Sequence, residues 1–281
     1  MNQPIGVFDS GIGGLSILKA LRLAMPAERF VYFADTAHNP YGEKSEGFVV
    51  ERSLSIVKTL VEQHHIKALV VACNTATAAA IHVLRDAYPA LPIVGVEPAL
   101  KPAALATRSG RVLVLATRGT LTSEKFAQLK ARLIQEHAAS QRDLHFTCVP
   151  CDGLAERIEQ LATSGRRWHD TPELIAACAG FMPATDHFSS KNDQKNEVFD
   201  TLVLGCTHYP LIRDLWRDLF ASLVGEGVMI MDNAQPVAQR TMQLIAGLRA
   251  PSDQAGGVTW LSSGDAAQLV QAARYWGVES A

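Results

Sequence analysis

Two cysteines stand directly after short apolar segments, at the positions where α/β proteins place working groups. Cys73 follows residues 68–72, and Cys206 follows residues 201–204 and a glycine. Apolar segments of this kind are typical of buried strands in a parallel sheet. Because ligands bind beyond the carboxyl ends of such strands, the sequence predicts that both thiols lie at ligand-binding edges.

The residues after each cysteine are polar, as a site requires and a packed core does not. Asn74 and Thr75 follow the first thiol, and Thr207 and His208 follow the second. A nearby cation or helix N-terminus lowers a thiol pKa from its usual value of about 8.5, and a predicted helix follows each cysteine. A single Cys–His pair would indicate a covalent nucleophile. Two strand-end thiols facing each other across a cleft instead favour removal of a proton from one face of a carbon and delivery to the other. Two buried structural thiols are the alternative.

The rest of the chain alternates strand-like and helical segments, which is typical of α/β architecture. The predicted strands are residues 5–8, 30–34, 68–72, 92–96, 111–116, 145–149, 201–204, 228–231 and 258–261. The pattern restarts after Pro98, which indicates a second domain inserted into the first. We therefore predict a first domain of residues 1–97 plus 209–281 and a second of residues 98–208.

Asp9 and Ser10 follow the first strand. A carboxylate there suits a substrate ammonium, and a hydroxyl beside helix-start amides suits a substrate carboxylate. Residues 11–13 begin like a dinucleotide fingerprint, but Ser16 replaces its third glycine and the Walker lysine is absent, which disfavours a nucleotide. Residues 41–42 and 117–120 add hydroxyls and amides at other strand-to-helix loops, so a small anionic ligand fits best.

The composition of the chain limits the classes of binding partner that we expect. The 281-residue chain has a formal net charge of −2, which gives no electrostatic reason to expect nucleic acid or an anionic membrane. It has no apolar run of ~18 residues and no basic N-terminal segment, so we expect a cytoplasmic protein.

Its five cysteines are an odd number, which indicates free thiols. Cys148 and Cys151 have the spacing of a redox pair, with two thiols at a strand end as the alternative. No zinc-type pattern is present, so we expect no metal.

Seven stretches in order along the chain together resemble glutamate racemase, the cofactor-independent enzyme of the aspartate/glutamate racemase superfamily. They are Gly6–Gly14, Ala34–Ala37, Pro40–Gly42, Val71–Ala76, Gly95–Pro98, Leu204–Leu211 and Met231–Asp232. The resemblance implies two similar α/β domains, each a mainly parallel sheet flanked by helices, with the active site in the cleft between them. It also implies interconversion of L- and D-glutamate without a cofactor, supplying D-glutamate to peptidoglycan.

The same resemblance implies roles for individual residues. Cys73 would be the base toward D-glutamate and Cys206 the base toward L-glutamate, assisted by Asp9, His208 and Glu159. The residues implied to bind the substrate are Asp9, Ser10, Tyr41, Gly42, Asn74, Thr75, Thr117, Thr207 and His208. From the sequence alone, Glu159 would be a solvated charge on a helix, and Asp35 either a helix cap or a site carboxylate.

Some features depart from the pattern or leave alternatives open. The second-strand motif has Ala34 and His38 where the family usually has Gly and Arg, and residues 185–196 predict an exposed loop outside the motifs. A racemase for aspartate, a hydantoin or another small amino acid is one alternative, and a non-catalytic amino-acid-binding module is another. Some glutamate racemases bind DNA gyrase, but no motif here indicates it. A homodimer stays open.

Overall fold

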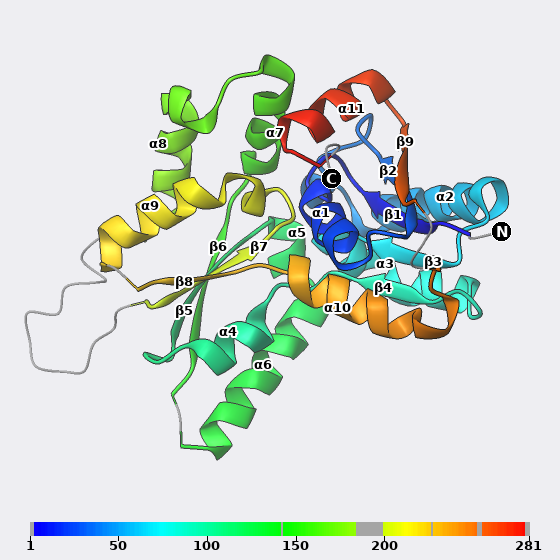
Figure 1. The fold of residues 1–281 in the computed structure, drawn as a ribbon. Helices are drawn as coiled ribbons and strands as arrows, with labels where there is room; N and C mark the ends of the chain where they lie inside the picture. The colour runs from blue at the N-terminus through cyan, green and yellow to red at the C-terminus, as the bar shows by residue number, and fades with distance from the viewer. Residues whose placement is uncertain (1–2, 142, 184–198, 226, 252–254, 279–281) are drawn as a thin grey trace, which may run out of the picture.

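Two parallel β-sheets form the frame of the molecule (Figure 1). The computed structural model describes residues 3–141, 143–183, 199–225, 227–251 and 255–278. The predicted loop 185–196 lies outside these ranges. Nine strands are present in the described residues, one for each predicted strand, and every pairing between them is parallel. The predicted α/β class is confirmed.

The first sheet has five strands in the order β4-β3-β1-β2-β9. Its strands are β1 (Ile5–Asp9), β2 (Arg29–Ala34), β3 (Ala68–Val71), β4 (Ile93–Gly95) and β9 (Gly257–Ser262). One face packs on α1 (Leu15–Ala24), α10 (Ala234–Leu244) and α11 (Ala266–Tyr275), and the other on α2 (Glu46–His64) and α3 (Asn74–Ala87). Alternate residues of β3 enter opposite cores: Val70 packs on the first face, whereas Leu69 and Val71 pack on the second. Burial on both faces explains why these strands are continuous apolar runs.

The second sheet has four strands in the order β6-β5-β7-β8. They are β5 (Arg111–Ala116), β6 (His145–Pro150), β7 (Thr201–Gly205) and β8 (Met229–Met231). Helices α4 (Leu100–Ala106) and α6 (Glu124–Ala139) cover one face. Helices α7 (Leu154–Ser164), α8 (Pro172–Gly180) and α9 (Arg213–Val224) cover the other. Short helical segments complete the chain: η1 (Tyr41–Glu43), α5 (Arg118–Leu121), η2 (Trp168–Asp170), η4 (Tyr209–Ile212) and η5 (Ala246–Leu248).

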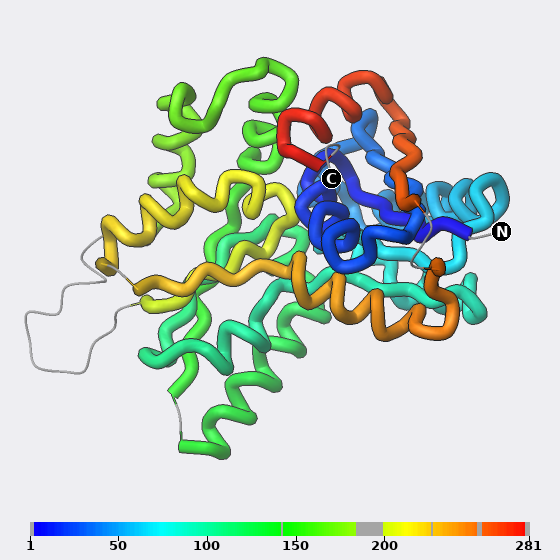
Figure 2. Tube along the Cα trace, in the orientation of Figure 1, coloured from blue at the N-terminus to red at the C-terminus, as the bar shows by residue number. Residues whose placement is uncertain are grey.

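The chain passes from the first sheet to the second after β4 and returns after β8 (Figure 2). The final strand β9 pairs with β2, as the predicted return to the N-terminal sheet requires. The predicted boundary after His208 is too early, because β8 pairs with β7 and α9 packs in the second core. A three-residue strand carries too little sequence pattern to show which sheet it joins.

Helix α4 contains Pro102 in its first turn, where proline is tolerated. The helix predicted after Cys206 needs correction, because it begins as the 3-10 turn η4 and α9 starts only at Arg213. Cys206 therefore does not precede an α-helix directly, unlike Cys73.

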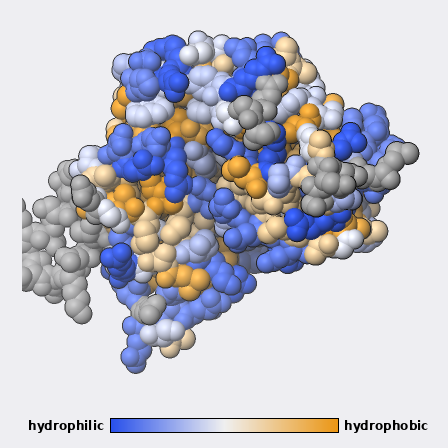
Figure 3. All heavy atoms as spheres, viewed as in Figure 1, coloured by the Kyte–Doolittle hydropathy of each residue, from blue (hydrophilic) through white to orange (hydrophobic). Residues whose placement is uncertain are grey.

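The surface shown in Figure 3 is mostly hydrophilic, with hydrophobic residues in separate patches. The most exposed large apolar side chains in the described residues are Leu23, Leu105 and Leu248, which belong to α1, α4 and η5. Single exposed apolar residues of this kind are ordinary. Within the described residues, no helix combines the length and apolar character that a membrane span requires.

Candidate active site

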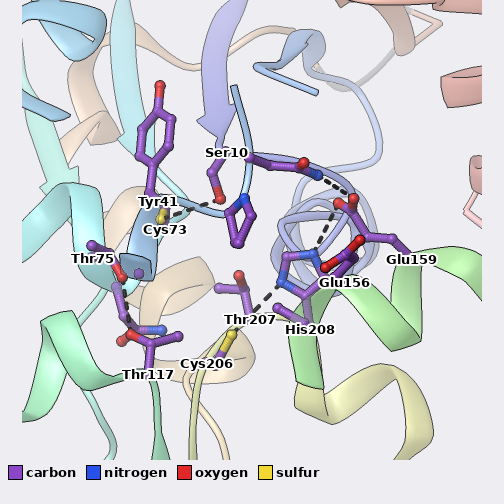
Figure 4. Close-up of a pocket in the computed structure, with 15 residues that line it drawn as sticks. Ser10, Tyr41, Cys73, Thr75, Thr117, Glu156, Glu159, Cys206, Thr207 and His208 are labelled. Carbon is purple, nitrogen blue, oxygen red and sulfur yellow. Dashed lines mark hydrogen bonds and ion pairs between the residues drawn. The ribbon is translucent and has the colours of Figure 1, made fainter. Parts of the chain in front are cut away.

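The loops after β3 and β7 bring Cys73 and Cys206 to one pocket between the two sheets (Figure 4). The pocket holds about 380 Å³ of space, its open mouth included. Its lining contains every predicted site residue except Asp9: Ser10, Tyr41, Gly42, Cys73, Asn74, Thr75, Thr117, Glu159, Cys206, Thr207 and His208. Asp9 is fully buried directly behind this lining. The structure therefore brings together residues that lie far apart in the sequence.

Cys73 occupies the N-cap of α3, a helix of 14 residues. Its Sγ accepts a hydrogen bond from the backbone N–H of Ala76 at 3.4 Å, and its thiol donates toward the Ser10 hydroxyl at 3.7 Å. Burial is the largest cause that raises the pKa of Cys73, and the nearby Asp9 carboxylate raises it further, to about 12. These effects outweigh the helix-start amide, so Cys73 keeps its proton at neutral pH.

Asp9 is a buried carboxylate that joins the two halves of the site. Its Oδ1 accepts from the backbone N–H of Gly11 at 2.8 Å, and its Oδ2 accepts from the Thr207 hydroxyl at 3.1 Å. Burial raises the pKa of Asp9 to about 6, although His208 and the hydrogen bonds oppose the shift. Asp9 thus comes from the loop after β1 but bonds to the loop that carries Cys206.

Cys206 has a histidine beside it rather than a helix N-terminus. His208 Nδ1 lies 3.7 Å from Cys206 Sγ, and His208 Nε2 lies 3.0 Å from Glu159 Oε1 (Figure 4). Burial lowers the pKa of His208, but its bonds to Cys206 and Glu159 outweigh burial and raise that pKa well above the usual range. Burial raises the pKa of Glu159, but the hydrogen bond and charge of His208 and the bonds from Ile12 and Asn39 together outweigh burial and lower that pKa. His208 is therefore a buried imidazolium that can donate from both ring nitrogens.

The structure places Glu159 in the pocket wall, where helical position alone predicts a solvated charge. It projects from α7 and accepts a second hydrogen bond at Oε1, from the backbone N–H of Ile12 at 2.8 Å. Asn39 donates to Oε2. Because Ile12 and Asn39 belong to the first-sheet part of the chain, Glu159 is held from both sides of the cleft.

The glycines after β1 let the backbone approach this pair closely. A Cβ on Gly11 would lie 1.9 Å from Glu159 Oε1, and a Cβ on Gly13 would lie 2.4 Å from His208 Nδ1. Neither contact is tolerable, so side chains at these positions would push the histidine pair away. The glycine-rich turn that partly resembles a nucleotide loop therefore serves close packing against the second half of the site.

The side wall near Cys73 is made of hydroxyls and one amide. Thr75 Oγ1 and Thr117 Oγ1 lie 3.0 Å apart, and Thr117 continues to the hydroxyl of Thr120 at 3.0 Å. Asn74 is 96% buried and accepts at Oδ1 from Asn233, but its Nδ2 has no partner in the described structure. A buried donor without a partner is costly, so this amide is well placed for an acceptor group of a ligand.

Asp35 is neither a helix cap nor a pocket residue. It is fully buried and accepts from Nη2 and Nε of the Arg52 guanidinium, at 2.8 and 3.0 Å. It also accepts from the Tyr41 hydroxyl and bonds His38 Nδ1 at 2.9 Å. These bonds lower the pKa of Asp35 to about 2 despite burial. Asp35 thereby fixes the loop that presents Tyr41 and Gly42 to the pocket.

Four lining residues were not predicted: Asn39, Pro40, Ala155 and Glu156. Asn39 and Pro40 directly precede the predicted Tyr41, and Glu156 lies one turn before Glu159 on α7, so helical spacing could have suggested it.

The redox interpretation of Cys148 and Cys151 is not supported, because Cys151 packs in the core on one face of the second sheet and Cys148 on the other. Among the residues described, no group of three metal-ligating side chains could hold a metal ion.

The arrangement can move a proton across a small ligand. One thiol comes from each half of the molecule, and both open into the same pocket. One thiol keeps its proton and the other adjoins a protonated histidine, which is an acid and base arrangement for an activated C–H bond.

Comparison with known proteins agrees with this geometry. Residues 16–241 match the family model described as Asp/Glu/Hydantoin racemase. A glutamate racemase of Ectopseudomonas mendocina is 45% identical over 269 residues, which is 94% of this chain and 92% of the relative. A glutamate racemase isoform of Bacillus anthracis has a similar structure, with a TM-score of 0.77 and 29% identity over 99% of this chain and 95% of that one. Escherichia coli glutamate racemase, solved with L-glutamate and the activator UDP-MurNAc-ala, has a TM-score of 0.74 and 30% identity over 98% and 95% of the two chains.

Proposed function

The chain belongs to the Asp/Glu/hydantoin racemase family, and we propose that it interconverts L- and D-glutamate by proton transfer between Cys73 and Cys206. The observation that carries the proposal is the convergence of two thiols, one from each half of the molecule, on a single pocket. The relative solved with L-glutamate supports the choice of substrate. The product, D-glutamate, would supply peptidoglycan synthesis.

The proton moves in two balanced steps. For L-glutamate, the Cys206 thiolate removes the Cα proton and becomes a thiol, leaving a carbanion. The Cys73 thiol then gives its own proton to the opposite face of that carbon and becomes a thiolate. In the return direction the two cysteines exchange roles. The high pKa of Cys73 suits it to hold the proton that it later gives to the carbanion formed from L-glutamate.

The other residues bind the substrate or prepare the thiols. The Asp9 carboxylate attracts the substrate ammonium, and that positive charge opposes the effect by which Asp9 raises the pKa of Cys73. His208, held by Glu159, keeps a cation beside Cys206. The orphaned Nδ2 of Asn74 donates to a substrate carboxylate, together with the hydroxyls of Ser10, Thr75 and Thr117 and the backbone near Tyr41, Gly42 and Thr207.

An isotope experiment tests the proposal. Metal-free, reduced protein without pyridoxal phosphate is incubated with L-glutamate in deuterated water, and Cα exchange and optical rotation are followed. We expect both deuterium incorporation and inversion. No exchange would overturn the proposal, and the protein would then fit an amino-acid-binding module. Turnover of aspartate or a hydantoin in place of glutamate would identify a different substrate.

The cofactor-free reaction, the cytoplasmic location and the homodimer stay predictions. Full activity of metal-free protein without pyridoxal phosphate tests the first. Fractionation of cells tests the second, and sedimentation of the protein with and without glutamate tests the third.

A further inference from the structure

The carboxylate of Glu159 has three donors in the described structure, and two come from the opposite half of the molecule. Oε1 accepts from His208 Nε2 at 3.0 Å and from the backbone N–H of Ile12 at 2.8 Å. Oε2 accepts from the side-chain amide of Asn39. Because a carboxylate only accepts, the nitrogen of the Asn39 amide must face it. Asn39 is the one side chain of the first half among these three donors.

Asn39 connects two parts of the site that the reaction uses separately. It lies just before η1, the segment that presents Tyr41 and Gly42 to the pocket. The same loop is anchored on its far side by Asp35, which holds the Tyr41 hydroxyl and Arg52. The loop is thus held in two places. Tyr41 is bonded to Asp35, and Asn39 is bonded to Glu159, the partner of His208.

A neutral donor is the side chain best suited to this position. An acid would repel the Glu159 carboxylate, and a cation would compete with His208 for it. The amide instead fills a remaining acceptor site of Oε2 and leaves Oε1 to the imidazolium and the Ile12 N–H. Hydrogen bonds to charged groups are the stronger ones, so the amide can fix the orientation of the carboxylate.

We propose that Asn39 is a positioning residue for the racemisation, acting through Glu159 and His208 on Cys206. This inference rests on the proposed function. It follows that the loop carrying Tyr41 and Gly42 must be seated before His208 is correctly oriented, so substrate enclosure and preparation of Cys206 are coupled.

Three single variants separate donor, shape and charge at this position. Asn39→Asp keeps the shape but sets a carboxylate against Glu159, Asn39→Leu keeps the size without a donor, and Asn39→Gln keeps the donor. We expect kcat/KM for glutamate to fall most in the Asp variant, by roughly a hundredfold, and by roughly tenfold in the Leu variant. The Gln variant is expected to recover most of the activity. Asn39 is only half-buried, so all three variants should fold, which thermal unfolding checks.

A reciprocal exchange makes the test specific. When Asn39→Asp is combined with Glu159→Gln, the new carboxylate faces the new amide, so an acceptor again meets a donor. In the Glu159→Gln background, Asn39→Asp should therefore raise kcat/KM instead of lowering it. Equal loss in both backgrounds would overturn the proposal.

Two further outcomes have distinct meanings. A rise in KM with kcat unchanged, independent of the side chain at position 159, would also overturn the proposal and show that Asn39 contacts the substrate directly. Failure of the wild-type protein to racemise glutamate would instead refute the proposed function on which the inference rests.

Discussion

The Cys73 and Cys206 ends of the pocket hold chemically identical groups in opposite electrostatic surroundings. Cys73 lies at the start of a long helix with a hydroxyl and a buried carboxylate nearby, and its pKa is raised to about 12. Cys206 precedes only a 3-10 turn and lies 3.7 Å from an imidazolium that Glu159 supports. The position after a strand thus determines where a thiol lies, whereas side chains from other elements determine the charges around it.

Each end also depends on the opposite half of the molecule. Asp9, beneath Cys73, accepts from Thr207 on the Cys206 loop. Glu159, behind His208, accepts from Ile12 in the turn after β1. The two halves must therefore be docked before either thiol has its full surroundings. Because enantiomers have equal free energies, a variant must lower kcat/KM equally in both directions, so differences between the ends must be sought in other measurements.

Replacing either thiol gives the largest expected effect. Cys73→Ser and Cys206→Ser should each lower racemisation by at least about a hundredfold, because a serine hydroxyl is a far weaker acid and base here. Exchange without inversion distinguishes the two ends. In deuterated water, Cys206→Ser should still exchange the Cα hydrogen of D-glutamate and Cys73→Ser that of L-glutamate, as proton NMR can measure. Full racemisation by either variant would remove that cysteine from the mechanism.

Neutralising Glu159 tests the Cys206 end. In Glu159→Gln the His208 imidazolium loses its charged partner, so the pKa of His208 falls and the cation is lost at lower pH. We expect kcat to fall about tenfold to a hundredfold, with the alkaline limb of the pH profile displaced to lower pH. Asp152→Asn, at the exposed ion pair with Arg118 nearby, is the matched control. An unmoved alkaline limb would mean that Glu159 does not govern the charge of His208.

The raised pKa of Asp9, at the Cys73 end, can be tested through the pH dependence of the free energy of unfolding. Its pKa is raised from 3.8 to about 6, so its contribution to stability is fully present below pH 3.8 and is lost as the pH rises through about 6. A shift of this size corresponds to about 2 to 3 kcal/mol. Asp9→Asn keeps an acceptor for the Gly11 N–H but cannot ionise, so it should lack this loss.

The measurement is urea unfolding of wild type and Asp9→Asn at pH 4 and pH 8. The difference in free energy of unfolding should move in favour of the variant by about 2 to 3 kcal/mol between the two values, while racemisation is lost. Contributions from titrating groups that do not interact with Asp9 cancel in this difference. A constant difference would show that Asp9 ionises normally in the folded protein.

The sequence predicted where the two thiols lie, but not the contacts between distant loops that give each thiol its surroundings. Both thiols, their polar neighbours and all nine strands follow local pattern, because continuous apolar runs mark buried parallel strands. The difference between the two thiols does not follow from local pattern. Asp9 lies 64 residues before Cys73 in the chain, and Glu159 lies 47 residues before Cys206. Asn39 was missed because nothing in its own loop indicates a carboxylate on α7. The family resemblance pointed to Glu159, whereas helical position alone indicated a solvated charge.

The smallest expected effect concerns an uncharged hydrogen bond near Cys73 that joins the first-sheet and second-sheet parts of the chain. Thr75, on α3, and Thr117, after β5, share a hydrogen bond of 3.0 Å, whereas the corresponding link at the Cys206 end involves the charged Glu159. A bond between neutral hydroxyls contributes only about 1 kcal/mol. Thr75→Val should therefore raise KM for glutamate several-fold with little change in kcat, and Thr75→Ser, which keeps the hydroxyl, should resemble wild type. Steady-state kinetics in both directions measures this. If the Ser variant were impaired and the Val variant were not, the methyl group and its packing would matter rather than the hydroxyl, and the two ends would differ in more than charge.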